Sequence, residues 1–349
     1  MTTIDEQKNK LKQLLNEGLT LRLKLKTVNP TSSIIKEPLD RLQDIAQQCL
    51  KLSEVTQMDH GKAHAMEFNC FVQWTRIVIE ESSKQTTSIQ SLIDKTDSIE
   101  SQLLECRKLA LGFGDKVLVS RVLELLVNIY NKTNQLDKEI ETIEKAVDAD
   151  KSVPKVVVLL DALFRKLEFV YQDRDRIYQL NINKDPNAPP PQPDQQQDDG
   201  FMKLHIDTWE HYLWLKDQPS FPRDQYIVQK KAQLFKLSIY VGSLANPLIS
   251  LKDPEVLKIA NEAFDEAFYI ANLIQDKEYF CAATAHKSSV SYRTLPQPER
   301  ERLLQSLKDI ESQMKPKNSE IRDLIDSIEN KAPSLHPEEK EKDPPPKSS

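Results

Sequence analysis

The chain has 349 residues, of which 39% are hydrophobic and 29% charged, a balance that suits thin layers of amphipathic helices around a narrow core. Its 6 glycines are too few for the turns of a large β protein, or for the clustered glycines of a nucleotide-phosphate loop. A net charge of −6 argues against a nucleic-acid partner, and no apolar run approaches the roughly 20 residues of a membrane span.

Apolar residues recur every three or four positions along nearly the whole chain, which predicts helices throughout. The first predicted helix covers about residues 4–27. Its last part alternates apolar and basic residues as a strand does, but an isolated strand without a partner would be unstable, so we expect it to end the helix. Its basic side chains are interpreted either as a solvated face or as a contact for an acidic partner (Arg22, Lys24 and Lys26).

The same periodicity predicts further helices separated by short connections, as in arrays of antiparallel helix pairs. We expect them near residues 37–52, 58–82, 87–111, 116–132, 137–149, 153–181, 201–217, 223–243, 254–274, 278–292, 298–314 and 318–330.

The helix near residues 58–82 carries a candidate metal-binding edge. His60, His64 and Glu67 follow the i, i+4, i+7 spacing that places three side chains on one side of a helix. The residues between the histidines form no HExxH motif, and ordinary surface or half-buried histidines are the simpler interpretation. A metal-binding protein or enzyme that uses these residues is therefore the alternative function.

Four widely spaced cysteines lie within apolar helical stretches and form no CxxC motif, so we expect free, buried thiols in a reducing compartment. The charged N-terminus lacks the apolar core of a signal peptide. We therefore expect a cytoplasmic or nuclear protein without membrane insertion. No residue pattern predicts a cofactor or a catalytic residue.

One segment, residues 121–150, resembles a tetratricopeptide repeat. Apolar residues stand at the packing positions of both helices, with a polar turn between them (Leu123, Leu126, Tyr130, Ile143 and Ala146). A second, partial match covers residues 266–292. The resemblance implies an all-α fold built as a tetratricopeptide-like α-solenoid, in which each helix pair stacks on its neighbour.

Residues 183–200 read NKDPNAPPPQPDQQQDDG and contain almost no apolar side chain that could be buried. We expect a disordered linker here and a disordered tail over residues 331–349. This predicts two helical-repeat halves, residues 1–182 and residues 201–330.

After the linker, the predicted helix of residues 201–217 places most apolar side chains on one broad arc (Leu204, Ile206, Trp209, Tyr212, Leu213 and Leu215). Trp214 falls outside that arc, among charged residues. It is expected either to pack under a neighbouring segment or to anchor a partner.

Together these features predict a non-enzymatic scaffold or adaptor that serves as a subunit of a larger complex. Its partners are expected to be one or more proteins. As a helical-repeat chain it is similar to subunits of ciliary and trafficking assemblies.

Overall fold

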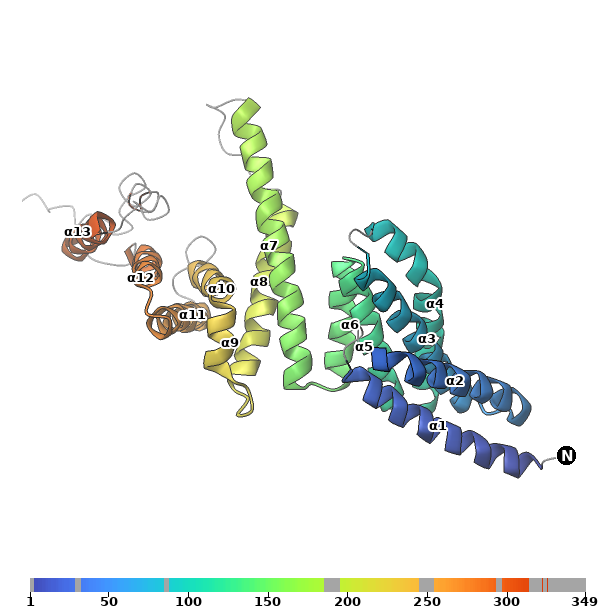
Figure 1. The fold of residues 1–349 in the computed structure, drawn as a ribbon. Coiled ribbons are helices and arrows are strands. Elements are labelled where there is room, and N and C mark those ends of the chain that lie inside the picture. Colours follow the sequence, from blue (N-terminus) through green and yellow to red (C-terminus); the bar gives the residue numbers. More distant parts are fainter. Residues whose placement is uncertain are drawn as a thin grey trace, which may run out of the picture. The chain divides into compact units, whose positions relative to one another are not determined.

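The structure is a computed structural model that describes residues 3–28, 33–84, 88–184, 195–244, 254–292 and 297–313, with positions 322 and 325. Every regular element within these ranges is a helix, which confirms the predicted all-α class (Figure 1). The chain divides into two compact units, Met1–Lys166 (unit 1) and Leu167–Ser349 (unit 2). None of the described helices is both long enough and apolar enough to cross a membrane.

The described part of unit 1 contains a short 3-10 turn and six whole helices, together with the start of a seventh. Their bounds are Ile4–Lys26 (α1), Ser33–Ile35 (3-10), Lys36–Thr56 (α2), Asp59–Ser82 (α3), Ile89–Phe113 (α4), Lys116–Lys132 (α5), Leu136–Ala149 (α6) and Val153–Lys184 (α7). From α1 to α6 each helix packs against the next one in the chain. In addition, α1 packs against α3, and α3 against α5.

The first helix has strong end signals. The Thr3 hydroxyl accepts from the Glu6 amide at 3.3 Å while the Glu6 carboxylate accepts from the Thr3 amide at 2.8 Å, a complete capping box. Lys24 and Lys26 lie in the last turn, where positive charge is favourable for the helix dipole. The alternating segment is helical to Lys26, as expected.

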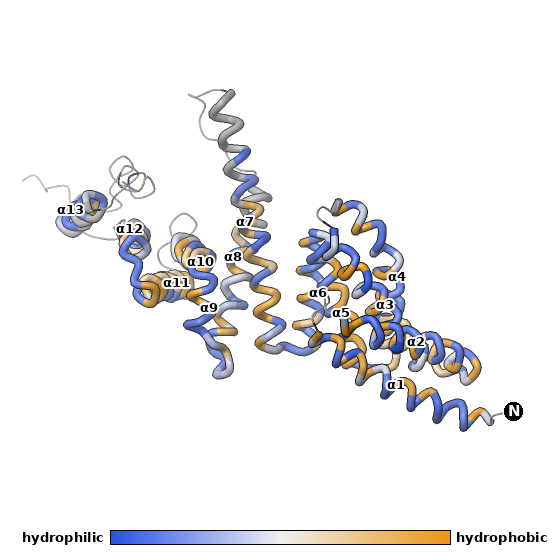
Figure 2. The backbone as a smooth tube through the Cα atoms, viewed as in Figure 1, coloured by the Kyte–Doolittle hydropathy of each residue, from blue (hydrophilic) through white to orange (hydrophobic). Residues whose placement is uncertain are grey.

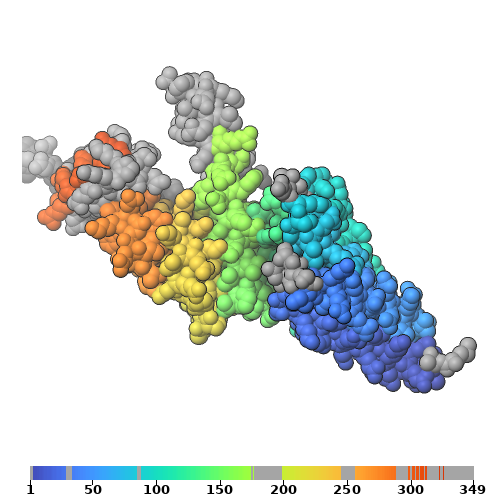
Figure 3. All heavy atoms as spheres, viewed as in Figure 1, coloured from blue at the N-terminus to red at the C-terminus, as the bar shows by residue number. Residues whose placement is uncertain are grey.

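The core of unit 1 is built mainly from the apolar faces of α1 to α5, and Figure 2 shows apolar and hydrophilic stretches alternating along these helices. At Gly61 a side chain would meet Leu11 Cδ2 at 2.8 Å, so glycine allows α3 to approach α1 closely. Three cysteines are buried free thiols in this core, here called the unit 1 cysteines (Cys49, Cys70 and Cys106). The space-filling view shows α1 and α2 forming one closely packed surface (Figure 3).

A tight turn joins α4 to α5. Gly114 ends α4 with a φ of +70°, a conformation that glycine adopts without strain. Asp115 then caps α5, because its Oδ1 accepts from the Leu118 amide at 2.9 Å. The turn and the cap together fix the position of the Asp115 carboxylate.

Within its described residues, unit 2 contains the rest of α7 and six further helices with defined bounds. These are Gln195–Lys216 (α8), Arg223–Gln229 (α9), Lys231–Ser243 (α10), Pro254–Leu273 (α11), Lys277–Tyr292 (α12) and Gln297–Gln313 (α13). Helix α10 packs against α8, α9, α11 and α12, and α12 packs against α13. A buried carboxylate, Glu266, accepts hydrogen bonds from Tyr212, from Lys216 at 2.7 Å and from Arg223 at 2.8 Å.

The buried face of α8 includes a histidine. His205 is fully buried and stacks on Tyr240 with 3.7 Å between ring centroids. Its Nδ1 lies 2.8 Å from the Phe201 carbonyl oxygen, and its Nε2 lies 2.7 Å from the Tyr171 hydroxyl. A carbonyl only accepts, so Nδ1 carries the proton and Nε2 accepts from the tyrosine.

The helices differ from the predicted ranges mainly at the linker and at residues 223–243, where two helices, α9 and α10, take the place of one predicted helix. α7 continues to Lys184, and α8 begins at Gln195 because its first residues are glutamines and aspartates, which a helix N-terminus tolerates or favours. The linker residues between these helices lie outside the described residues, as do residues 331–349 and most of residues 318–330. The compact units divide within α7, and the two predicted repeat halves, residues 1–182 and 201–330, remain a prediction.

Candidate functional site

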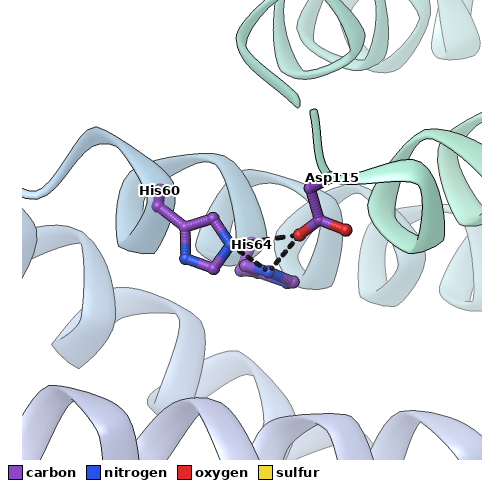
Figure 4. A group of neighbouring side chains, drawn as sticks. All are labelled: His60, His64 and Asp115. Carbon is purple, nitrogen blue, oxygen red and sulfur yellow. Dashed lines mark hydrogen bonds and ion pairs between the residues drawn. The ribbon is translucent and has the colours of Figure 1, made fainter. Parts of the chain in front are cut away.

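Two histidines of α3 and the capping aspartate of α5 converge in unit 1. His60 Nε2 and His64 Nε2 lie 3.0 Å and 3.1 Å from the same oxygen, Asp115 Oδ2, and 3.3 Å from each other (Figure 4). The histidines are one helical turn apart, and the turn between α4 and α5 supplies the carboxylate. These three side chains are called the His60–His64–Asp115 cluster.

Arg121 sets the proton position in this cluster. Its Nη2 lies 2.9 Å from His64 Nδ1, and because a guanidinium only donates, Nδ1 must accept and Nε2 carries the imidazole proton. Burial, with the positive charge of Arg121, lowers the pKa of His64 to about 4 despite the opposing effect of Asp115. His64 is therefore a neutral donor to Asp115.

The carboxylate of the cluster is held ionised. Burial raises the pKa of Asp115, but hydrogen bonds from the Leu118 amide and from His60 lower it more, so that its pKa lies below the usual range. The cluster thus combines one negative charge with two imidazoles at a partly exposed corner of unit 1.

Glu67 does not belong to this cluster. It is 0% exposed, and its Oε1 accepts from Arg22 Nε at 3.0 Å, while Arg121 Nε lies 3.5 Å from Oε2. The Arg22 guanidinium also lies over the Phe71 ring, 3.7 Å from its centroid. The third residue near the histidines is therefore Asp115 rather than the expected Glu67, because Glu67 points into a buried ion-pair network.

The predicted partner contacts are placed in different environments. Arg22 is only 3% exposed, so it lies in the interior and not on the basic surface that the sequence suggested. Lys24 and Lys26 are exposed, and Lys26 forms an ion pair with Glu124 at 2.5 Å. Trp214 is half-buried, whereas Trp209 on the same helix is buried.

A groove of about 750 Å³ lies in unit 1 beside the cluster. Its lining comes from α4, α5, α6 and the start of α7 and is largely apolar, with several basic groups (Leu111, Gly114, Lys116, Val117, Val119, Ser120, Arg121, Leu123, Ala146, Ala149, Asp150 and Lys155). Three large apolar side chains around the α4–α5 turn are exposed: Leu111, Phe113 and Val117. Leu111 and Val117 line the groove, and Phe113 contacts His60 with 6.0 Å between ring centroids.

Sequence reasoning missed this groove, although a signal was present. Leu111 lies off the apolar stripe that Leu103, Cys106 and Ala110 form on the buried face of α4, whereas Phe113 continues the spacing of that stripe but is exposed. Large apolar residues outside the core-facing stripe of a helix are candidates for a binding surface.

No protein-family model matches the chain, and no curated protein matches it.

Proposed function

We propose that the chain is a non-enzymatic protein-interaction scaffold or adaptor, and that the groove of unit 1 is a docking surface for a partner protein. The observation that carries this proposal is the combination of an apolar groove with exposed Leu111, Phe113 and Val117 around it. Exposed apolar side chains that gather around a groove are candidates for an interaction surface.

The order of helix packing supports a repeat architecture. Contacts between successive helices, together with the α1–α3 and α3–α5 contacts, are what stacked helix pairs make. A tetratricopeptide-like solenoid is the form that we propose, because α5 and α6 coincide with the segment that resembles the repeat. Such arrays present grooves between helices to extended or helical segments of other proteins.

The charges at the groove indicate the chemistry of the partner. Lys116, Arg121 and Lys155 contribute positive charge. Lys155 pairs with Asp150 at 2.9 Å and Arg121 lies 3.5 Å from the buried Glu67, so among the described residues Lys116 supplies the positive charge that has no ion-pair partner. An apolar segment flanked by acidic residues would match both features.

Lys24, Lys26 and Trp214 remain predicted contacts elsewhere on the chain. Cytoplasmic or nuclear location, within an assembly of the ciliary or trafficking kind, also remains our proposal.

Two exposed valines provide a matched test of the docking surface. Val117 in the groove is 66% exposed and Val55 on α2 is 60% exposed, so an aspartate at either position leaves the core intact. Tagged wild type, Val117→Asp and Val55→Asp would be purified from the native source, and proteins that co-purify would be quantified. We expect Val117→Asp to lose at least about tenfold of a specific partner, an effect of roughly 1.4 kcal/mol, while Val55→Asp retains it. Equal recovery with all three proteins would contradict the proposal.

A further inference from the structure

We propose that the His60–His64–Asp115 cluster is a binding site for one Zn²⁺ ion, with three protein ligands and a fourth position for water. The three ligand atoms are separated by 3.0, 3.1 and 3.3 Å. In a tetrahedral zinc site with metal–ligand bonds of about 2.0–2.1 Å, the ligand atoms lie about 3.3–3.4 Å apart. The side chains therefore already stand near the separation that a bound ion would impose.

The donor set favours zinc over Mg²⁺ and Ca²⁺. Two imidazole nitrogens with one carboxylate oxygen form a mixed nitrogen and oxygen set that suits Zn²⁺, whereas Mg²⁺ and Ca²⁺ prefer oxygen ligands alone. Two neutral imidazoles and one carboxylate reduce the charge of the ion to a single net positive charge. The side chain of His60 is 46% exposed, so the site is accessible to water as a fourth ligand.

The ligands are held by the fold rather than by each other. His60 and His64 share one face of α3, and the second carboxylate oxygen of Asp115 accepts from the Leu118 amide. Hydrogen bonds of this kind to the non-ligating oxygen orient carboxylate ligands in metal sites. Little reorganisation of the helices would be needed for binding.

Arg121 is the group that must move. Zinc would take the lone pair of His64 Nε2, so the proton now on Nε2 would transfer to Nδ1 and the imidazole would stay neutral. Nδ1 could then no longer accept from Arg121. The guanidinium has another acceptor close by, because Glu67 Oε2 is 3.5 Å from Arg121 Nε and makes no hydrogen bond among the described residues. Binding would thus exchange one contact of Arg121 for another.

The test uses the full chain, stripped of metal with a chelator and then exchanged into metal-free buffer. Zn²⁺ would be titrated by calorimetry, and Co²⁺ would be added as a spectroscopic probe, since tetrahedral Co²⁺ absorbs strongly in the visible range. We expect one ion per chain. His60→Ala and Asp115→Asn should each weaken Zn²⁺ binding at least about tenfold and remove the visible band.

The variants separate a ligand role from a structural one. Asparagine caps helices as well as aspartate does, so Asp115→Asn keeps the α5 cap while it removes the charged ligand. His211→Ala on α8 is the matched control and should bind as the wild type does. Absence of both calorimetric heat and the Co²⁺ band in the wild type would refute the site. Metal binding that is unchanged in His60→Ala and Asp115→Asn would also refute it. Neither result depends on the docking proposal.

Discussion

The buried ion pair between Arg22 and Glu67 gives the most direct test of the packing in unit 1. Arg22→Met keeps most of the length and apolar stem of the side chain but removes the guanidinium. Glu67 would then be fully buried with Arg121 Nε, at 3.5 Å, as its nearest positive group. We expect a large loss in the free energy of unfolding of unit 1.

The magnitude follows from the burial. Removing one partner of a buried ion pair typically costs about 3–5 kcal/mol, because the remaining charge has lost the interaction that offset its desolvation. Both Arg22 and Glu67 are nearly inaccessible, at 3% and 0% exposed, so solvent cannot replace the lost contact. Residual attraction to Arg121 places the expected loss near the lower end, at about 3 kcal/mol.

The unit 1 cysteines make the measurement specific to one unit. Unfolding of unit 1 exposes all three thiols, so a short pulse of alkylating reagent at each urea concentration reports its unfolded fraction. Mass spectrometry of the corresponding peptides gives the transition midpoint for unit 1 without interference from unit 2. The midpoint of Arg22→Met should fall well below that of the wild type.

The control lies two residues away on the same helix. Lys24→Met removes an exposed positive charge, and we expect a change within about 0.5 kcal/mol. In the double variant Arg22→Met with Glu67→Met, part of the lost stability should return, because apolar replacements of a whole buried pair are often tolerated. A loss below about 1 kcal/mol for Arg22→Met alone would show that the pair does not hold Glu67 as described.

Three further predictions concern the thiols, unit 2 and its tryptophans. Burial raises the pKa of Cys49 to about 11 and the pKa values of Cys70 and Cys106 to about 12. In native protein at pH 8 the half-buried Cys281 should therefore be alkylated first, and the unit 1 cysteines only after unfolding. Burial raises the pKa of Glu266, but its hydrogen bonds lower it more, so that it lies below the ordinary value of 4.5. The ionised Glu266 carboxylate therefore stabilises the folded state of unit 2 above that pH, and this stabilisation is lost as the pH falls below it. Acid titrations followed by circular dichroism should show this loss in the wild type and much less of it in Glu266→Gln. In urea titrations, Trp209→Ala should cost about 3–5 kcal/mol and the half-buried Trp214→Ala clearly less; equal losses would contradict the burial difference between them.

Much of the helical layout could be predicted because helix formation depends on local periodicity and caps. The predicted ranges match α1 to α6 within a few residues, and the low glycine count correctly excluded a β fold. Side-chain burial was harder to predict. On α8, Ile206 belongs to the predicted apolar arc but is exposed, while His205 is fully buried. Burial follows from the neighbouring helix surface, and the sequence of one helix does not contain that information.

The candidate site could likewise be predicted only in part from the sequence. The spacing of His60 and His64 was visible in the sequence, since both lie on one helix. Asp115 lies 51 residues beyond His64 and reaches it only because α5 packs against α3. Glu67 has suitable helical spacing, but its side chain meets two arginines from other helices instead. Contacts between distant segments decide which polar residues meet, and periodicity cannot supply them.

His64 and His205, the histidines buried among the described residues, are fixed as opposite tautomers. Arg121 leaves the proton of His64 on Nε2, whereas the Phe201 carbonyl holds the proton of His205 on Nδ1. Imidazole ¹⁵N resonances distinguish protonated from unprotonated ring nitrogens. In one NMR spectrum His64 should therefore show a protonated Nε2 and an unprotonated Nδ1, and His205 the reverse. Each compact unit therefore carries its own isotopic reporter, and loss of one pattern with survival of the other would identify which unit a ligand or a substitution has perturbed.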